Sequence, residues 1–92
     1  MSKVSIIGLG HIGMNILQTF AQAGIDALGV EVDQSTIDRR LERSKNNLET
    51  LVKKGKISPE RRDEVLSKMK VSKDINNIKG SEFVIESILT TS

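Results

Sequence analysis

The sequence predicts an α/β fold: a four-stranded parallel sheet in the strand order 3-2-1-4, with a helical hairpin inserted between the second and third strands. Three observations lead to this prediction. A short apolar run at residues 4–7 passes directly into a glycine-rich turn, segments with helical spacing alternate with short apolar runs, and the run at residues 83–89 is almost continuously apolar. Alternating strands and helices favour a parallel sheet, and the right-handed crossover rule sets its order.

Composition limits the possible functions. The 92 residues suffice for one domain with a modest core, which should be aliphatic because Phe20 and Phe83 are the only aromatic residues. Cysteine is absent, which excludes a disulfide framework and a cysteine nucleophile, and no metal site is predicted. No apolar run approaches the roughly 20 residues of a membrane span. We therefore expect a soluble, cytoplasmic protein without a membrane partner.

Basic residues are concentrated in the middle of the chain. Residues 34–73 contain twelve of the fourteen lysines and arginines and six acidic residues, which gives this region a net charge of +6 and the remainder −4. Such charge runs usually keep helices solvated. A nucleic-acid partner is not predicted, because neither an RNA-binding aromatic signature nor a zinc pattern accompanies the charge.

The first predicted elements are a strand at residues 4–7, a glycine turn and a helix. In this order, each glycine of Gly8-x-Gly10-x-x-Gly13 has its own role. Gly8 permits the tight turn, Gly10 lets a pyrophosphate approach the backbone, and Gly13 lets the helix pack closely on its strand. The unpaired N–H groups at the helix start favour an anion. We therefore predict cofactor binding by Gly8, Leu9, Gly10, His11, Ile12 and Gly13.

A second apolar stretch follows at residues 25–32, after Gly24 has ended the helix, and contains Glu31, eighteen residues beyond Gly13. A carboxylate at the tip of the second strand can accept hydrogen bonds from the adenosine ribose hydroxyls and repel a 2′-phosphate, so NAD is favoured over NADP. The plain alternative is a solvated strand-end carboxylate. Asp33 competes for the ribose role, but we interpret it as the N-cap of the next helix, because a helical pattern begins directly after it.

The helical hairpin is predicted over residues 34–70. Its first helix has one apolar stripe at spacings of three, four and seven, formed by Ile37, Leu41, Leu48, Leu51 and Val52. Gly55 suits its C-terminal cap, and Ser58 with Pro59 suits the start of the second helix.

The remaining segments complete the sheet. Val71 lies at the centre of a short extended segment, and Asp74 is positioned to cap a helical turn that Gly80 ends. The apolar run at residues 83–89 is typical of a parallel strand covered on both faces. Residues 1–92 therefore predict half of a Rossmann doubly wound fold, the N-terminal half of an NAD-binding domain.

With these elements in place, the chain resembles the 3-hydroxyacyl-CoA dehydrogenase family, in particular its 3-hydroxybutyryl-CoA dehydrogenase-like members. The discriminating segments are residues 41–44 (LERS), 51–57 (LVKKGKI), 73–74 (KD) and 84–87 (VIES). The resemblance implies an NAD-dependent oxidoreductase of fatty acid metabolism that interconverts 3-hydroxyacyl-CoA and 3-ketoacyl-CoA by hydride transfer. It also implies that Glu31 binds the adenosine ribose, where the family usually has aspartate.

The resemblance assigns further residues. Asn47 and Lys54 fall on the positions where the family contacts the acyl-CoA substrate, although the first of these is usually a serine. Ile88 and Leu89 fall at the cofactor site. Thr90 replaces a glutamate that lies near the nicotinamide ribose in the family, so that contact is expected to be missing.

The family's catalytic histidine, its glutamate partner and its substrate-binding asparagine are all expected beyond residue 92. No catalytic residue is therefore predicted here, and the single histidine, His11, lies in the glycine turn. Alone, the chain is expected to be inactive. Two alternatives remain open: a non-catalytic module that binds ADP-ribose, NAD or FAD, and a structural half-Rossmann unit that associates with itself.

The last predicted strand, at residues 83–89, leaves one edge unpaired and contains neither proline nor lysine. An unprotected apolar edge is a template for pairing with another chain. We expect a homodimer in which two such strands pair antiparallel. The alternative is a monomer with a frayed C-terminus.

Overall fold

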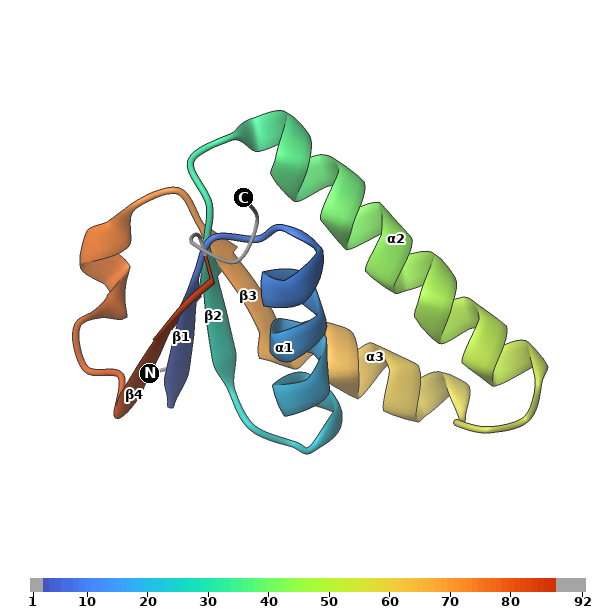
Figure 1. Ribbon diagram of the computed structural model, residues 1–92. Coiled ribbons are helices and arrows are strands. Elements are labelled where there is room, and N and C mark those ends of the chain that lie inside the picture. The colour runs from blue at the N-terminus through green and yellow to red at the C-terminus, as the bar shows by residue number, and fades with distance from the viewer. Residues whose placement is uncertain (1–2, 88–92) are drawn as a thin grey trace.

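The computed structural model describes residues 3–87 (Figure 1). One sheet is built from four strands, β1 (Val4–Ile7), β2 (Ala27–Val30), β3 (Met69–Ser72) and β4 (Phe83–Glu86). Their order in space is β3-β2-β1-β4, and every neighbouring pair is parallel. The predicted strand order is therefore confirmed.

Three α-helices connect the strands, α1 (His11–Gln22), α2 (Gln34–Lys53) and α3 (Pro59–Lys68), and the short 3-10 helix η1 (Ile75–Ile78) precedes β4. All three α-helices lie on one side of the sheet, whereas η1 lies on the other (Figure 1). The crossover rule explains this division. The chain steps from β1 to β3 in one direction and returns to β4 in the other, so right-handed connections cover opposite faces.

The core lies between the sheet and its helices. Ile6 of β1 is fully buried, and its partners are Gly29 on β2 and Ile85 on β4. The core is aliphatic, as predicted, and Phe20 only packs against its margin. Its buried members are Val4, Ile6, Leu9, Met14, Leu17, Ala21, Ala27, Leu48, Val65 and Met69.

The predicted helix N-caps are present. The side chain of Asp33 accepts the backbone N–H of Thr36 at 3.1 Å and also its hydroxyl at 2.6 Å. The hydroxyl of Ser58 accepts the N–H of Arg61 at 3.0 Å, with Pro59 as the first residue of α3. These bonds satisfy N–H groups that have no partner within the helix. The hydrogen bonds to Asp33, above all the one from the Thr36 hydroxyl, lower the pKa of its carboxyl group.

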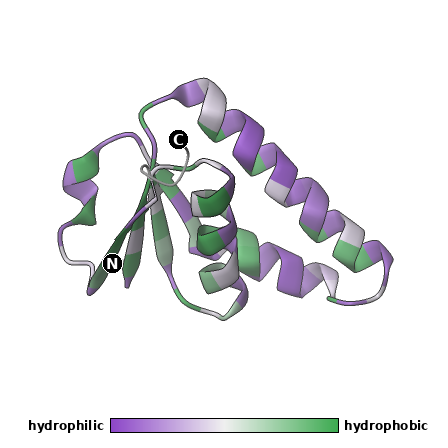
Figure 2. Cartoon of the chain, viewed as in Figure 1, coloured by the Kyte–Doolittle hydropathy of each residue, from purple (hydrophilic) through white to green (hydrophobic). Residues whose placement is uncertain are grey.

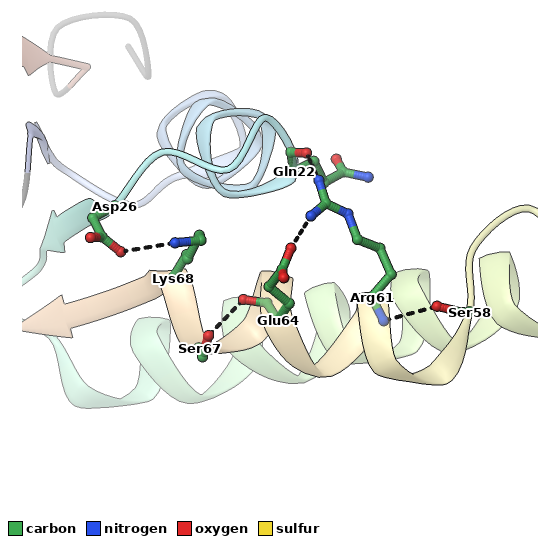
Figure 3. Close-up of polar contacts among 7 residues, drawn as sticks. All are labelled: Gln22, Asp26, Ser58, Arg61, Glu64, Ser67 and Lys68. Carbon is green, nitrogen blue, oxygen red and sulfur yellow. Dashed lines mark hydrogen bonds and ion pairs between the residues drawn. The ribbon is translucent and has the colours of Figure 1, made fainter.

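Polar contacts connect α3 to the end of α1 and to the residue before β2 (Figure 3). Arg61 donates to the carbonyl oxygen of Gln22 at the end of α1 and pairs with Glu64. The Lys68 amine lies 3.7 Å from Asp26 Oδ1, just before β2. These groups are partly exposed, so each ion pair contributes about 1 kcal/mol at most. Most residues along α2 are hydrophilic (Figure 2).

The last strand differs from its prediction. β4 ends at Glu86, and the final part of the expected strand, residues 88–89, lies outside the described residues. Strand β4 is also not covered on both faces, since Phe83 is 63% exposed and Val84 is 45% exposed. Within the described part of the chain, β4 lies at the edge of the sheet beside β1, and no described element covers Phe83.

Candidate nucleotide-binding site

A cavity of about 800 Å³ opens at the carboxyl ends of β1 and β2. Its walls come from the glycine turn, from the residues that follow β2 and from the segment that follows β3. Ligands of open α/β sheets bind at this edge, and pockets for small molecules commonly measure about 300–1,000 Å³. Position and size therefore make it the candidate functional site.

The turn from β1 to α1 is closed by backbone contacts. Gly8 has a φ of 91° and donates its N–H to the carbonyl of Val30 at 2.8 Å. A Cβ atom at Gly13 would lie only 2.0 Å from the Gly8 carbonyl oxygen and 2.5 Å from Ser87 Oγ. No side chain fits at this position, which is the close helix packing expected of the third glycine.

The N-terminus of α1 faces this cavity without a side-chain cap. Gly10 is the N-cap residue and lines the cavity, and the first turn contains no acidic residue. The first N–H groups of a helix lack partners within the helix, and the helix dipole adds positive potential. The turn therefore forms a cradle suited to phosphate.

Glu31 connects β2 to the glycine turn. Its Oε1 accepts the backbone N–H of Leu9 at 3.0 Å, and its Oε2 accepts the N–H of Asp33 at 3.1 Å. Each carboxylate oxygen retains capacity for a further hydrogen bond, and Glu31 lines the cavity. The carboxylate of Asp33 caps α2, so the interpretation of Asp33 as a cap rather than a ribose ligand is supported by its contacts.

Two residues of the turn point away from the cavity. The Leu9 side chain is fully buried, packed over Gly29, where a Cβ would lie 2.8 Å from both Leu9 methyl groups. Only the backbone of Leu9 faces Glu31. The Ile12 side chain is exposed and lines a shallow apolar groove with Ile16 and Phe20 on the outer face of α1. Gly8, Gly10, His11 and Glu31 are the predicted cofactor residues that the cavity brings together.

Sequence reasoning missed several cavity residues. Val32 is 74% exposed and Ile75 is 52% exposed, and both line the cavity, where they offer apolar walls to a flat base. The sequence did offer one indication for Val32, since it is an apolar residue between the acidic residues Glu31 and Asp33. Arg40 reaches the turn from α2 and donates from Nε to the Leu9 carbonyl at 3.3 Å. It had no distinguishing signal among the many basic residues of its helix.

Ser87 holds β4 to the glycine turn. Its buried hydroxyl donates to the carbonyl of Ile7 at 3.1 Å and to that of Gly8 at 2.5 Å. Nearly eighty residues separate these partners in the chain, so spacing could not reveal the contact.

The predicted acyl-CoA residues lie elsewhere. Asn47 is exposed on α2, Lys54 is exposed directly after its last residue, and neither lines the nucleotide cavity. Asn47 borders a smaller polar pocket of about 130 Å³ between α1 and α2, and Lys54 is the C-cap residue of α2. Ile88, Leu89 and Thr90 lie outside the described residues.

Comparison with known proteins identifies the family. Residues 3–91 match the model of the 3-hydroxyacyl-CoA dehydrogenase NAD-binding domain. The chain belongs to the 3-hydroxyacyl-CoA dehydrogenase family. NAD, the expected cofactor, is the one that this domain binds.

Individual family members support the match. The chain is 34% identical to a 3-hydroxybutyryl-CoA dehydrogenase from Clostridioides difficile over 91% of its length, and 32% identical to a glyoxysomal fatty acid β-oxidation multifunctional protein from Brassica napus over 97%. It covers 30% and 12% of these proteins, respectively. The chain thus spans less than a third of the relatives it matches.

Solved structures of dehydrogenases in the family have the same fold. The 3-hydroxybutyryl-CoA dehydrogenase of Escherichia coli K12 superposes with a TM-score of 0.87 and 25% identity, covering 92% of this chain and 18% of that one. The corresponding enzyme from Ralstonia eutropha gives a TM-score of 0.86 and 25% identity, covering 94% and 31%.

The residues of this dehydrogenase-family chain fit the adenosine diphosphate part of NAD. A turn with no side chain at Gly10 meets an uncapped helix start, a carboxylate follows the end of β2, and two exposed apolar side chains also line the cavity. Between residues 3 and 87, no helix is both long and apolar enough to cross a membrane.

Proposed function

We propose that this chain is the cofactor-binding portion of an oxidoreductase that interconverts 3-hydroxyacyl-CoA and 3-ketoacyl-CoA. The observation that carries the proposal is the Glu31 carboxylate, held beside the glycine turn by the Leu9 N–H at 3.0 Å. It stands where a dinucleotide fold needs an acceptor for the adenosine ribose. The names of the C. difficile and E. coli relatives support the reaction.

Each part of the cavity then has a role in binding. The turn around Gly10 and the start of α1 receive the diphosphate, Glu31 accepts hydrogen bonds from the ribose, and Val32 with Ile75 contacts the adenine. Bound NAD supplies the hydride acceptor. Asn47 on α2 and Lys54 at its C-cap are proposed to contact the acyl-CoA, and both are exposed and accessible to a substrate.

Residues 1–92 alone should bind the cofactor without turning over substrate. Their only histidine is His11. Its Nδ1 lies 3.4 Å from the guanidinium of Arg40, so this contact is with a basic side chain and not with a carboxylate. We propose a cytoplasmic location; the plant relatives are named as glyoxysomal or peroxisomal. The absence of NADH oxidation by acetoacetyl-CoA in a spectrophotometric assay would agree with this proposal, and turnover abolished by His11→Ala would contradict it.

Calorimetric titration tests the cofactor. We expect NAD and ADP-ribose to bind with similar dissociation constants, and NADP to bind about tenfold more weakly because its 2′-phosphate meets the Glu31 carboxylate. Glu31→Gln should weaken the binding of NAD and reduce the difference in affinity between NAD and NADP. The control Glu42→Gln, on the exposed surface of α2, should leave both dissociation constants unchanged. Tighter binding of NADP than NAD to the wild-type protein would contradict the role of Glu31.

A second candidate function is favoured by the exposed strand β4. Phe83 and Val84 leave apolar surface at the sheet edge, so the chain can be a module that pairs with a second copy and binds ADP-ribose, NAD or FAD without catalysis. FAD shares the ADP group with NAD. Tighter binding of FAD than of NAD in the same titrations would favour this module over the dehydrogenase portion.

A further inference from the structure

Arg40 is the one basic side chain among residues 3–87 that reaches the glycine turn from another helix by a hydrogen bond. It projects from α2, is half-buried, and donates from Nε to the Leu9 carbonyl at 3.3 Å. Its Nη1 lies 3.4 Å from Nδ1 of His11. It lines the nucleotide cavity and also the smaller pocket between α1 and α2, so its guanidinium stands at the boundary between them.

Within residues 3–87, no carboxylate forms an ion pair with Arg40. Among the described residues, the ion pairs involve Arg61, Arg62 and Lys68, and the two hydrogen-bond partners of Arg40 are a backbone carbonyl and an imidazole, neither of them a carboxylate. A guanidinium carries five N–H donors, so several remain available. A partly buried cation with spare donors beside a cavity is suited to an anionic ligand.

The surroundings indicate which anion this is. The guanidinium contacts the carbonyl of Leu9, the residue between Gly8 and Gly10, and the same turn leads into the uncapped start of α1. Backbone donors, the helix dipole and the Arg40 charge therefore act on the same volume. A planar guanidinium matches the oxygens of a phosphate better than those of a neutral sugar or base.

We propose that Arg40 donates hydrogen bonds to the diphosphate of the bound nucleotide and determines the preference of this cavity for diphosphates over uncharged nucleosides. The inference rests on the proposed function and adds an ionic contact to the backbone cradle. A purely structural role, in which Arg40 only ties α2 to the turn, would affect all adenosine ligands equally.

The test compares NAD, ADP and adenosine binding to wild type, Arg40→Gln and Arg40→Lys by calorimetry, with adenosine followed by competition. Arg40→Gln keeps an N–H donor for the Leu9 carbonyl but removes the charge. We expect it to raise the dissociation constants of NAD and ADP about tenfold and to change that of adenosine less than twofold. Arg40→Lys should retain part of the affinity, and the neighbouring exposed Arg39→Gln should have no effect.

The outcomes separate the two proposals. If wild type binds neither NAD nor ADP, the proposed function fails, and this inference fails with it. If wild type binds both and Arg40→Gln binds them equally well, only this inference fails. An equal loss for adenosine and ADP also overturns it, in favour of the structural role. Thermal unfolding without ligand verifies that each variant is folded, and should Arg40→Gln be unfolded, Arg40→Lys with salt titration decides.

Discussion

At the residue scale, Gly13 leaves no room for a side chain. Its missing side chain is required by two neighbours from distant parts of the chain, the carbonyl of Gly8 and the hydroxyl of Ser87. The first neighbour was predictable, because the glycine spacing is local and its geometry recurs in dinucleotide turns. The second was not, since Ser87 reaches the turn only when β4 has paired with β1.

Replacing Gly13 with alanine should therefore disrupt both the fold and the site. The new methyl group overlaps the Gly8 carbonyl at 2.0 Å, and a backbone atom cannot move aside cheaply. We expect Gly13→Ala to lower the free energy of unfolding by about 2–3 kcal/mol and to abolish NAD binding. Urea denaturation and calorimetry measure the two effects.

Gly24→Ala is the matched control, because its Cβ meets no atom within 4 Å and only the positive φ of 82° is strained. We expect the free energy of unfolding of this variant to be lower by about 1 kcal/mol and its affinity for NAD to be unchanged. Normal NAD affinity in Gly13→Ala would refute the close-packing explanation.

At the element scale, contacts between residues close in sequence were the easiest to predict. The caps at Asp33, Ser58 and Asp74 were predicted because a cap and the N–H it accepts lie two or three residues apart, so sequence spacing describes their geometry directly. Arg40 is the opposite case. The helix that bears it was predicted, but its contact with Leu9 spans 31 residues and depends on how α2 lies over the turn.

The cap of α2 should make stability depend on pH. Hydrogen bonds from Thr36 and Ser35 lower the pKa of Asp33 in the folded protein. A lowered folded pKa contributes stability above the ordinary value of about 3.9, and this contribution is lost as the pH falls through the folded pKa. Urea midpoints should therefore show wild type more stable than Asp33→Asn at pH 7, with the difference shrinking below about pH 4.

Asp38→Asn provides the comparison for this effect, since it removes a carboxylate from the interior of the same helix without touching the cap. A stability difference between wild type and Asp33→Asn that stays constant from pH 7 to pH 3 would show that the charge of Asp33 does not strengthen the cap.

Strand β4 gives a prediction about association. Its outer edge has no neighbour in the described sheet, and Phe83 is 63% exposed. Two copies can pair these edges antiparallel about a twofold axis. Sedimentation equilibrium should show a dimer of wild type at tens of micromolar and a monomer of Phe83→Lys.

Val32→Lys controls for this change, because it places a lysine at an apolar residue that is even more exposed than Phe83 but lies away from the edge. It should remain dimeric. A monomeric wild type, or equal dissociation of both variants, would exclude pairing through β4.

At the scale of the whole molecule, the strand order was predictable because chirality leaves few ways to connect four parallel strands. The same rule explains why η1 and the α-helices cover opposite faces (Figure 1). The exposure of β4 could not be predicted in this way. An apolar run indicates a strand suited to burial, but it carries no information on whether another element lies above it, and here none of the described elements covers Phe83.

The hydroxyl of Ser87 has a consequence for the order of events during biosynthesis. The glycine turn leaves the ribosome well before β4, since the hydrogen bonds that fix the carbonyls of Ile7 and Gly8 come from a residue translated about eighty positions later. β1 likewise gains its second neighbour only when β4 emerges. A nascent chain that ends before β4 can form the sheet of β1, β2 and β3, but its glycine turn lacks the hydrogen bonds from Ser87. Affinity for the nucleotide should therefore arise late and report that the sheet has closed.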